Sequence, residues 1–216
     1  MHTLLDVNNT LFTVIGYPMS YIEFFGTIFN ILCVWFVAKN KIINWPIGIL
    51  GTLLFGFLFF QIHLYSDFFE QIYFLITGFW GWWVWTNGRK TDAGEKPIKK
   101  LSAASRAAWL GIIVIGTALL GYFTANIHTY FPQVFTEAAS FPYLDAFTTV
   151  LSFVATIFLI RKELEAWYLW ILVDIIGIGL YWAKDVRLIS ILYVIFLILA
   201  TKGLITWIRL YKSKHN

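Results

Sequence analysis

The sequence predicts an all-α integral membrane protein with seven transmembrane helices, arranged as a 3+1+3 parallel repeat. The 216 residues are 59% apolar, 20% aromatic and only 13% charged, whereas ordinary globular domains contain about 25% charged residues. The apolar runs are continuous rather than alternating, and several are long enough to cross a hydrocarbon layer of about 30 Å. This pattern favours helices over a β-barrel. In addition, the second half of the chain repeats the first.

The N-terminal segment, residues 1–20, carries Asp6 and no Lys or Arg. It therefore lacks the basic start of a signal peptide. We expect it to lie on the extracytoplasmic side, with residues 7–17 forming a short amphipathic helix along the membrane interface.

Seven spans are expected at residues 21–38, 45–64, 68–86, 107–125, 143–160, 167–183 and 188–208. The second and third spans are the clearest, because nothing from 45 to 64 is charged and Glu70 is the only charge from 68 to 85. Four tryptophans close this hairpin, as in an interfacial aromatic belt. The basic connector 87–107 is interpreted as a solvated cytoplasmic loop.

The distribution of Lys and Arg predicts the orientation. Thirteen of them fall on one side of the seven spans, and only Lys184 and Arg187 fall on the other. By the positive-inside rule the basic side is cytoplasmic. The N-terminus is then outside and the C-terminus inside, which requires an odd number of spans.

An internal repeat links the two halves of the chain. A shift from Tyr21 to Tyr143 aligns residues 21–90 with 143–212 without a gap, and 14 of the 70 positions are identical. The matches include Trp45 with Trp167. We therefore predict two three-helix repeats, joined by a linker at 91–142 that holds the fourth span and followed by a cytoplasmic tail at 213–216. Two repeats with the same orientation would enclose a central pathway suited to alternating access.

Charged groups inside the membrane are functional candidates because they are costly to bury. Asp174 and Lys202 lie at similar depths from the cytoplasmic end of their spans, and we expect them to pair. A purely structural ion pair is an equally good interpretation. The aromatic residues Trp170 and Tyr181 share a helix face with Asp174, and Trp182 lies at its edge. Such a stripe is more often core than ligand platform, but a carboxylate within it suits a flat or cationic ligand.

Polar side chains near the extracytoplasmic ends of the second and third spans form a second set of candidate ligand-binding groups. Glu70 and Gln71 begin the third span, and Gln61 ends the second. Thr52 faces the opposite side of the second span from Gln61, so both can line one pocket only if the helix distorts. A helix–helix hydrogen bond is as good an interpretation for Gln61 as a ligand contact.

Enzymatic chemistry has little support in the sequence. No histidine lies centrally in a span, no metal-ligand spacing or phosphate-binding glycine loop is present, and Cys33 is the only cysteine. We therefore expect no cofactor, no metal and no intrachain disulfide. The small basic excess of +4 does not indicate a nucleic-acid partner.

Several motifs resemble the PnuC family of bacterial vitamin transporters. They are the stretch FFQIHLY at 59–65 followed by Gln71, the pair Gly81-Trp82, the tryptophans Trp167 and Trp170, and the Arg161-Lys162 pair. The resemblance covers nearly all of residues 20–210. It implies a bacterial inner-membrane protein with a fold similar to the SWEET sugar carriers, assembled as a homotrimer. It also implies nicotinamide riboside as substrate, entering by facilitated diffusion and trapped by phosphorylation in the cytoplasm.

In that setting, Trp182, Tyr181 or Trp170 would stack on the cationic nicotinamide ring. Gln61, Gln71 and Asp174 would hold its carboxamide and ribose hydroxyls. A carrier of another vitamin or of a small sugar remains an alternative, as does an intramembrane enzyme or a structural membrane subunit.

Overall fold

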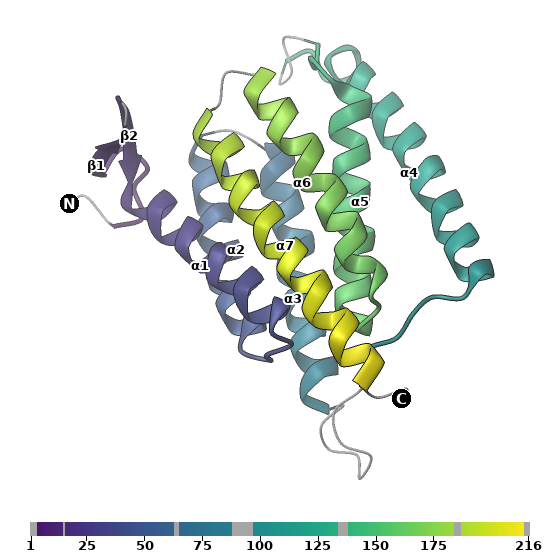
Figure 1. Cartoon of the computed structure of the whole chain (residues 1–216). Coiled ribbons are helices and arrows are strands. Elements are labelled where there is room, and N and C mark those ends of the chain that lie inside the picture. The colour runs from purple at the N-terminus through teal and green to yellow at the C-terminus, as the bar shows by residue number, and fades with distance from the viewer. Residues whose placement is uncertain are drawn as a thin grey trace. The chain divides into compact units, whose positions relative to one another are not determined.

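The computed structural model describes residues 4–14, 16–62, 65–87, 97–133, 138–183 and 187–213. Within these ranges the chain forms seven α-helices and one β-hairpin (Figure 1). The elements in order are β1 (Thr10–Val14), β2 (Tyr17–Ser20), α1 (Tyr21–Ala38), α2 (Asn44–Gln61), α3 (Tyr65–Asn87), α4 (Ala103–Tyr130), α5 (Pro142–Arg161), α6 (Glu165–Ala183) and α7 (Arg187–Ser213). The prediction of an all-α membrane protein is confirmed.

Six of the seven helices in the described ranges are long and apolar enough to cross a membrane. The exception is α3, which has sufficient length at 23 residues. Asp67, Glu70 and Gln71 lower its mean hydropathy most, and its four tryptophans, which favour the membrane interface over the hydrocarbon centre, lower it further. The most extended helix relative to its predicted span is α4, which begins four residues earlier and ends five residues later. Ser102 fixes the early start by accepting a hydrogen bond from the Ser105 N–H.

The expected interfacial helix at residues 7–17 is wrong, because the structure has an antiparallel hairpin there. Thr13 pairs with Pro18, and Val14 pairs with Tyr17. β-Branched residues in β1 favour the extended backbone, and Pro18 is a poor residue for a helix interior. Gly16 adopts φ +82° in the turn, a conformation that glycine accepts without steric penalty.

The chain divides into two compact units. The first comprises Met1–Ile98, Ile160–Lys162 and Ile198–Asn216. Here α1 packs on α2 and α2 on α3, with glycines at the crossings. A Cβ at Gly51 would lie 3.0 Å from the Asn30 amide, and one at Gly81 would overlap the Trp45 indole. Small residues at these positions let membrane helices approach closely, because dispersion contacts rather than hydrophobic burial drive their packing.

The second unit comprises Lys99–Leu159 and Glu163–Leu197. It contains α4, most of α5, α6 and the first part of α7. Gly121 of α4 lies against the ring of Tyr143, and Gly177 of α6 lies against the ring of Tyr193. These contacts repeat the principle seen in the first unit, with a glycine on one helix receiving an aromatic ring from its neighbour.

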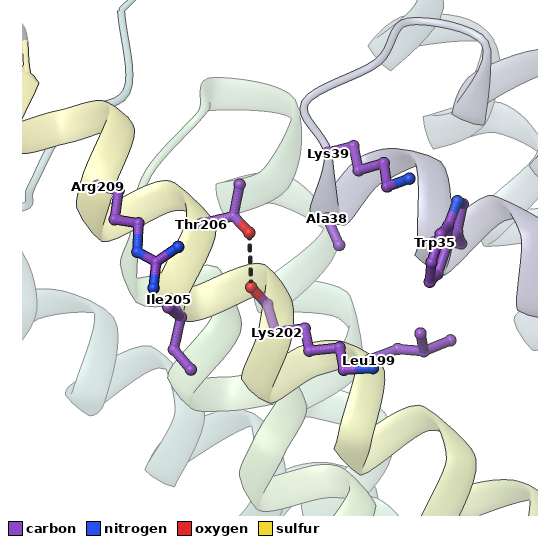
Figure 2. Close-up of a pocket in the computed structure, with 8 residues that line it drawn as sticks. All are labelled: Trp35, Ala38, Lys39, Leu199, Lys202, Ile205, Thr206 and Arg209. Atoms are coloured by element: carbon purple, nitrogen blue, oxygen red, sulfur yellow. Dashed lines mark hydrogen bonds between the residues drawn. The ribbon is translucent and has the colours of Figure 1, made fainter.

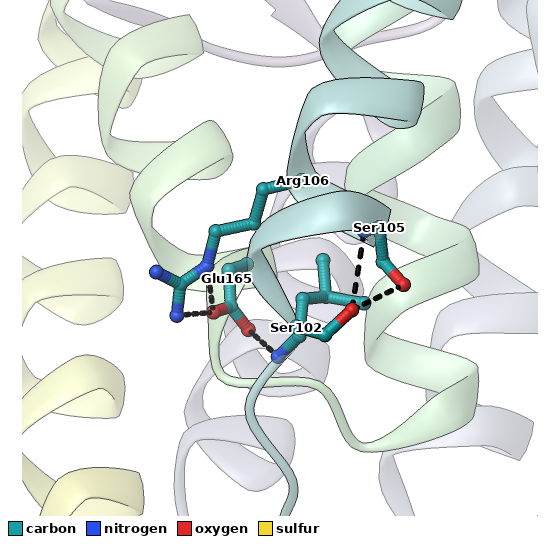
Figure 3. A network of polar contacts seen from close by, with 5 residues as sticks. Ser102, Ser105, Arg106 and Glu165 are labelled. Atoms are coloured by element: carbon teal, nitrogen blue, oxygen red, sulfur yellow. Dashed lines mark hydrogen bonds and ion pairs between the residues drawn. The ribbon is translucent and has the colours of Figure 1, made fainter.

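A polar network fixes the start of α4 to the start of α6 in the second unit (Figure 3). The Arg106 guanidinium donates to Glu165 Oε1 through Nη2 at 2.8 Å and through Nε at 3.1 Å. Glu165 Oε2 accepts from the backbone N–H of Leu101 at 3.1 Å. The Glu165 carboxylate thus anchors the chain that leads from the basic connector into α4.

The internal repeat is visible in the backbone. Asn40 and Lys162 occupy equivalent positions after α1 and α5, and both adopt left-handed φ values, 54° and 58°. The N–H of the next residue returns to a carbonyl five residues earlier in both cases, at 2.9 Å for Lys41 and 2.8 Å for Glu163. This helix ending satisfies the last carbonyls of the helix. The two repeats therefore use the same turn between their first and second helices.

Candidate functional site

A reciprocal pair of tryptophans joins the two repeats within the first unit. Trp85 lies in the last turn of α3, and Trp207 holds the equivalent position in α7. The Trp85 indole Nε1 donates to the Ile160 carbonyl at 3.2 Å, and the Trp207 Nε1 donates to the Val37 carbonyl at 3.2 Å. The rings lie 6.4 Å apart at 41°, and Trp207 is fully buried. Each repeat therefore donates a hydrogen bond to the end of the first helix of the other.

The position of these bonds bears on the orientation of the repeats. Val37 lies at the carboxyl end of α1, and Ile160 lies at the carboxyl end of α5. Since Trp85 and Trp207 also lie near the carboxyl ends of their helices, equivalent ends of both repeats meet at one place. This arrangement supports a parallel repeat, because an inverted repeat would place equivalent ends on opposite sides.

The second helix of each repeat carries a buried polar residue at an equivalent position. Thr52 in α2 is 9% exposed, and Asp174 in α6 is 3% exposed. Within the described part of the second unit, no hydrogen bond or ion pair reaches the Asp174 carboxyl group. A charged group near the membrane centre costs about 2.5–3.5 kcal/mol on insertion scales. Asp174 is therefore the strongest candidate for a ligand-binding group.

Trp170 lies one helical turn before Asp174, on the same face of α6. Its indole Nε1 is buried, and among the described residues it has no hydrogen-bond partner. The carboxyl group can accept hydrogen bonds and the indole can donate one. Together they offer a ligand one charged acceptor and one donor in an apolar environment.

Tyr181 and Trp182 close the same helix. The Tyr181 ring stacks on Tyr193 of α7, with centroids 5.3 Å apart and planes at 24°, so it belongs to the contact between α6 and α7. Trp182 is 62% exposed. Trp170, Asp174 and Tyr181 therefore all lie on α6 within the second unit. Trp182 lies on the same helix, but its side chain is at the surface of the chain.

The outer candidates of the first unit lie on two neighbouring helices. Gly56 of α2 faces Gln71 of α3, where an added Cβ would lie 3.7 Å from the Gln71 Cβ. Glu70 and Gln71 are both partly buried. Their roles toward a substrate remain predictions.

Gln61 makes contacts that neither sequence interpretation anticipated. Its amide donates to the carbonyls of Leu5 at 2.7 Å and Phe57 at 3.1 Å, and its Oε1 accepts from the Val7 N–H at 3.1 Å. The side chain therefore fastens the N-terminal segment to the end of α2. These bonds occupy both ends of the amide in this conformation.

Lys202 is exposed and lines a basic pocket with Lys39 and Arg209 (Figure 2). It belongs to the first unit, whereas Asp174 belongs to the second. The expected ion pair between them remains a prediction.

Sequence reasoning missed two polar residues at equivalent positions in the first helix of each repeat, Asn30 and Ser152. Asn30 donates to the Gly26 carbonyl at 2.9 Å and packs on Gly51, next to Thr52. Ser152 is buried and donates to a carbonyl one turn earlier at 2.9 Å. The signal was present, because both are polar residues near the middle of a predicted span.

The described residues contain no group of three potential metal ligands. In the first unit, Cys33 packs against Gly48, where an added Cβ would lie 2.8 Å from its Sγ. Its place is in the contact between α1 and α2.

Comparison with known proteins gives a consistent result. A family model described as nicotinamide mononucleotide transporter matches residues 20–209. The nicotinamide riboside transporter PnuC of Escherichia coli is 29% identical over 208 residues, covering 89% of this chain and 87% of the relative. The riboflavin/roseoflavin transporter RibM of Streptomyces davaonensis is 25% identical over 203 residues, covering 93% of this chain and 91% of the relative.

A solved structure, the crystal structure of the vitamin B3 transporter PnuC, matches with a TM-score of 0.69 and 26% identity. The match covers 89% of this chain and 83% of that one. The resemblance suggested by the sequence motifs is therefore confirmed. The chain belongs to the nicotinamide mononucleotide transporter family and is a multi-pass membrane transporter, not an enzyme.

Proposed function

We propose that this protein takes up nicotinamide riboside by facilitated diffusion, through one central site between its two three-helix repeats. The observation that carries the proposal is the buried Asp174 carboxyl group, which has no partner among the described residues of the second unit and lies one turn from the unpaired Trp170 indole N–H. The names of the E. coli relative and of the solved structure, a riboside transporter and a vitamin B3 transporter, support the same substrate class.

The chemistry of nicotinamide riboside matches these groups. Its pyridinium ring is flat and carries a positive charge, so the Asp174 carboxylate would neutralise it and lower the cost of burying both charges. The aromatic rings of Trp170 and Tyr181 would contact the cationic ring face. The hydroxyl of Thr52 and the amide of Gln71 would form hydrogen bonds with the carboxamide and ribose groups.

The chemistry of these groups favours nicotinamide riboside over nicotinamide mononucleotide, the compound named in the family description. The nucleotide adds a phosphate, which would be repelled by a carboxylate in the same site. Neither α2 nor α6 contains a Lys, Arg or His residue that would compensate for this phosphate. We therefore assign the uncharged ribose of the riboside, and not a phosphorylated ribose, to the site.

Binding by purified protein tests the substrate and the role of Asp174 together. Calorimetric titration of Asp174→Asn should show nicotinamide riboside binding at least tenfold more weakly than in the wild type. Reduced nicotinamide riboside is the matched ligand, since its ring has a similar size and no charge, and its affinity should change little. Glu23→Gln removes a carboxylate from the start of α1 and serves as the control. Equal losses for both ligands would contradict a charge-specific contact.

Transport without ion coupling is tested in liposomes that contain the purified protein. Uptake of labelled nicotinamide riboside should proceed down its own gradient when proton and sodium gradients are both absent. A requirement for either gradient would rule out uniport.

Orientation and assembly are part of the same proposal. The bias of Lys and Arg toward one side places the N-terminus outside and the C-terminus in the cytoplasm of the bacterial inner membrane. Cysteine labelling of each terminus in intact cells tests this topology. The resemblance to the PnuC family supports a homotrimer, which light scattering of the detergent-solubilised protein can measure.

A second candidate substrate is riboflavin, because the S. davaonensis relative is named as a riboflavin/roseoflavin transporter. Riboflavin carries no positive charge and would not need Asp174. Tighter binding of riboflavin than of nicotinamide riboside, unaffected by Asp174→Asn, would favour this alternative. Thiamine and glucose complete the binding panel, covering another vitamin and a small sugar.

A further inference from the structure

A pocket of about 330 Å³ lies in the first unit, between the end of α1 and the second part of α7. Figure 2 shows Trp35 and Lys39 on one wall and Lys202, Ile205 and Arg209 on the other. Because Lys39 follows the first helix of one repeat and Arg209 lies in the last turns of the third helix of the other, an occupant would touch both repeats. Nothing in the proposed transport function requires this pocket.

The pocket is strongly basic. Its lining contains Lys39, Lys202 and Arg209 and no acidic residue. Within the described part of the first unit, no ion pair joins any of the three to a carboxylate. Lys202 and Arg209 are seven residues apart on α7 and therefore share a helix face. Three cations around one hollow repel each other unless an anion lies between them.

The positive-inside rule accounts for basic residues at this end of the helices, but not for their convergence on a concave surface. Lysines that only reach toward water extend outward from the helix. In Figure 2 the Lys202 side chain instead extends from α7 toward α1, and Lys39 Nζ lies 4.0 Å from the centre of the Trp35 ring. All three cationic residues line the same pocket, Lys39 at the end of α1 and Lys202 and Arg209 on α7.

The rim of the pocket is apolar. Trp35 is 40% exposed, and Ile205 is 46% exposed. On the same two helices, Leu32 and Ile198 are also exposed, one to two turns closer to the membrane centre. A tryptophan beside cations is typical of the level at which lipid headgroups meet the hydrocarbon. The surface therefore offers cations at headgroup depth and an apolar track directly beneath them.

We propose that this pocket binds an anionic phospholipid, with its phosphate held by Lys39, Lys202 and Arg209 and its acyl chains lying along α1 and α7. Basic pockets between transmembrane helices on the cytoplasmic side are suited to anionic lipid headgroups. A volume of about 330 Å³ is at the lower end of the range for ligand pockets, about 300–1,000 Å³, which suits a headgroup rather than a whole lipid. The bound lipid would connect the two repeats at this end.

Native mass spectrometry of the full-length protein tests the proposal. The protein is titrated in detergent with phosphatidylglycerol and, separately, with phosphatidylcholine. Phosphatidylglycerol should bind at least tenfold more tightly than phosphatidylcholine to the wild type. The variant Lys39→Gln/Arg209→Gln should lose at least tenfold in phosphatidylglycerol affinity. The matched control Lys41→Gln/Lys212→Gln removes the same charge outside the pocket and should retain wild-type affinity.

Three results would overturn the proposal. The first is equal binding of the two lipids, which would indicate an apolar surface without headgroup recognition. The second is an equal loss in the pocket variant and the control, which would indicate a general effect of net charge. The third is displacement of phosphatidylglycerol by millimolar inorganic phosphate without acyl-chain dependence, which would assign the site to a soluble anion. Circular dichroism and gel filtration of each variant verify that it is folded.

Discussion

Removal of one hydrogen bond from the reciprocal tryptophan pair should have a measurable effect on stability. Trp207→Phe keeps an aromatic ring but deletes the Nε1–H that donates to the Val37 carbonyl at 3.2 Å. That carbonyl also accepts from the Asn40 N–H at 2.9 Å, so it is not left without a donor. Side-chain hydrogen bonds in membrane proteins contribute about 0.6–1.7 kcal/mol. The smaller ring leaves a void of roughly 40 Å³, which adds about 1 kcal/mol.

The expected loss is therefore about 2 kcal/mol in the free energy of unfolding, a factor of about 30 in the folded-to-unfolded ratio. Titration with sodium dodecyl sulfate, followed by far-ultraviolet circular dichroism, measures it without relying on tryptophan fluorescence. Trp83→Phe is the control, because Trp83 is 65% exposed and should change stability by less than about 0.5 kcal/mol. Because the Trp85 and Trp207 rings are neighbours, the stability loss of the double variant Trp85→Phe/Trp207→Phe should differ from the sum of the two single losses by about 0.5 kcal/mol or more. Equal stability of Trp207→Phe and Trp83→Phe would refute the reasoning.

Two further predictions concern helix packing and the α4–α6 network. Gly81→Ala should destabilise the protein by about 1–3 kcal/mol, because the added methyl overlaps the buried Trp45 ring; Gly111→Ala, where nothing lies within 4 Å, should be neutral in the same detergent titration. Glu165→Ala should lower thermal stability more than Arg106→Ala. The Glu165 carboxylate accepts hydrogen bonds from both Arg106 and a backbone N–H. The Arg106 side chain is 53% exposed, so solvent can replace its partner. A larger effect of Arg106→Ala would show that the backbone contact contributes little.

The positions of the helices were predictable from sequence because membrane insertion imposes a length and a polarity on each span. The predicted start of the first span coincides with that of α1, and the other predicted starts lie within about four residues of the observed ones. The N-terminal segment was not predictable in the same way. Its mixture of apolar and polar residues fits an interfacial helix or a hairpin, and Gly16 and Pro18 decide in favour of the hairpin.

The candidate site was predictable only in part. Asp174 stood out because a carboxyl group within a span is costly, and the structure shows it buried, without a partner among the described residues of the second unit. Gln61 could not be assigned from sequence, because its contacts with Leu5 and Val7 join residues more than fifty positions apart. Asn30 was overlooked because a single amide produces a weaker polarity signal than a charge.

The sequence by itself determined the membrane environment, the number of helices and the equivalence of the two repeats, since these follow from local hydropathy and from residue identity at a constant spacing. Only the tertiary structure decided which polar groups have partners. The reciprocal hydrogen bonds of Trp85 and Trp207 and the gathering of Lys39, Lys202 and Arg209 around one pocket depend on distant helix ends meeting. No local pattern encodes such meetings, because they arise from side-chain packing across helices that are far apart in the chain.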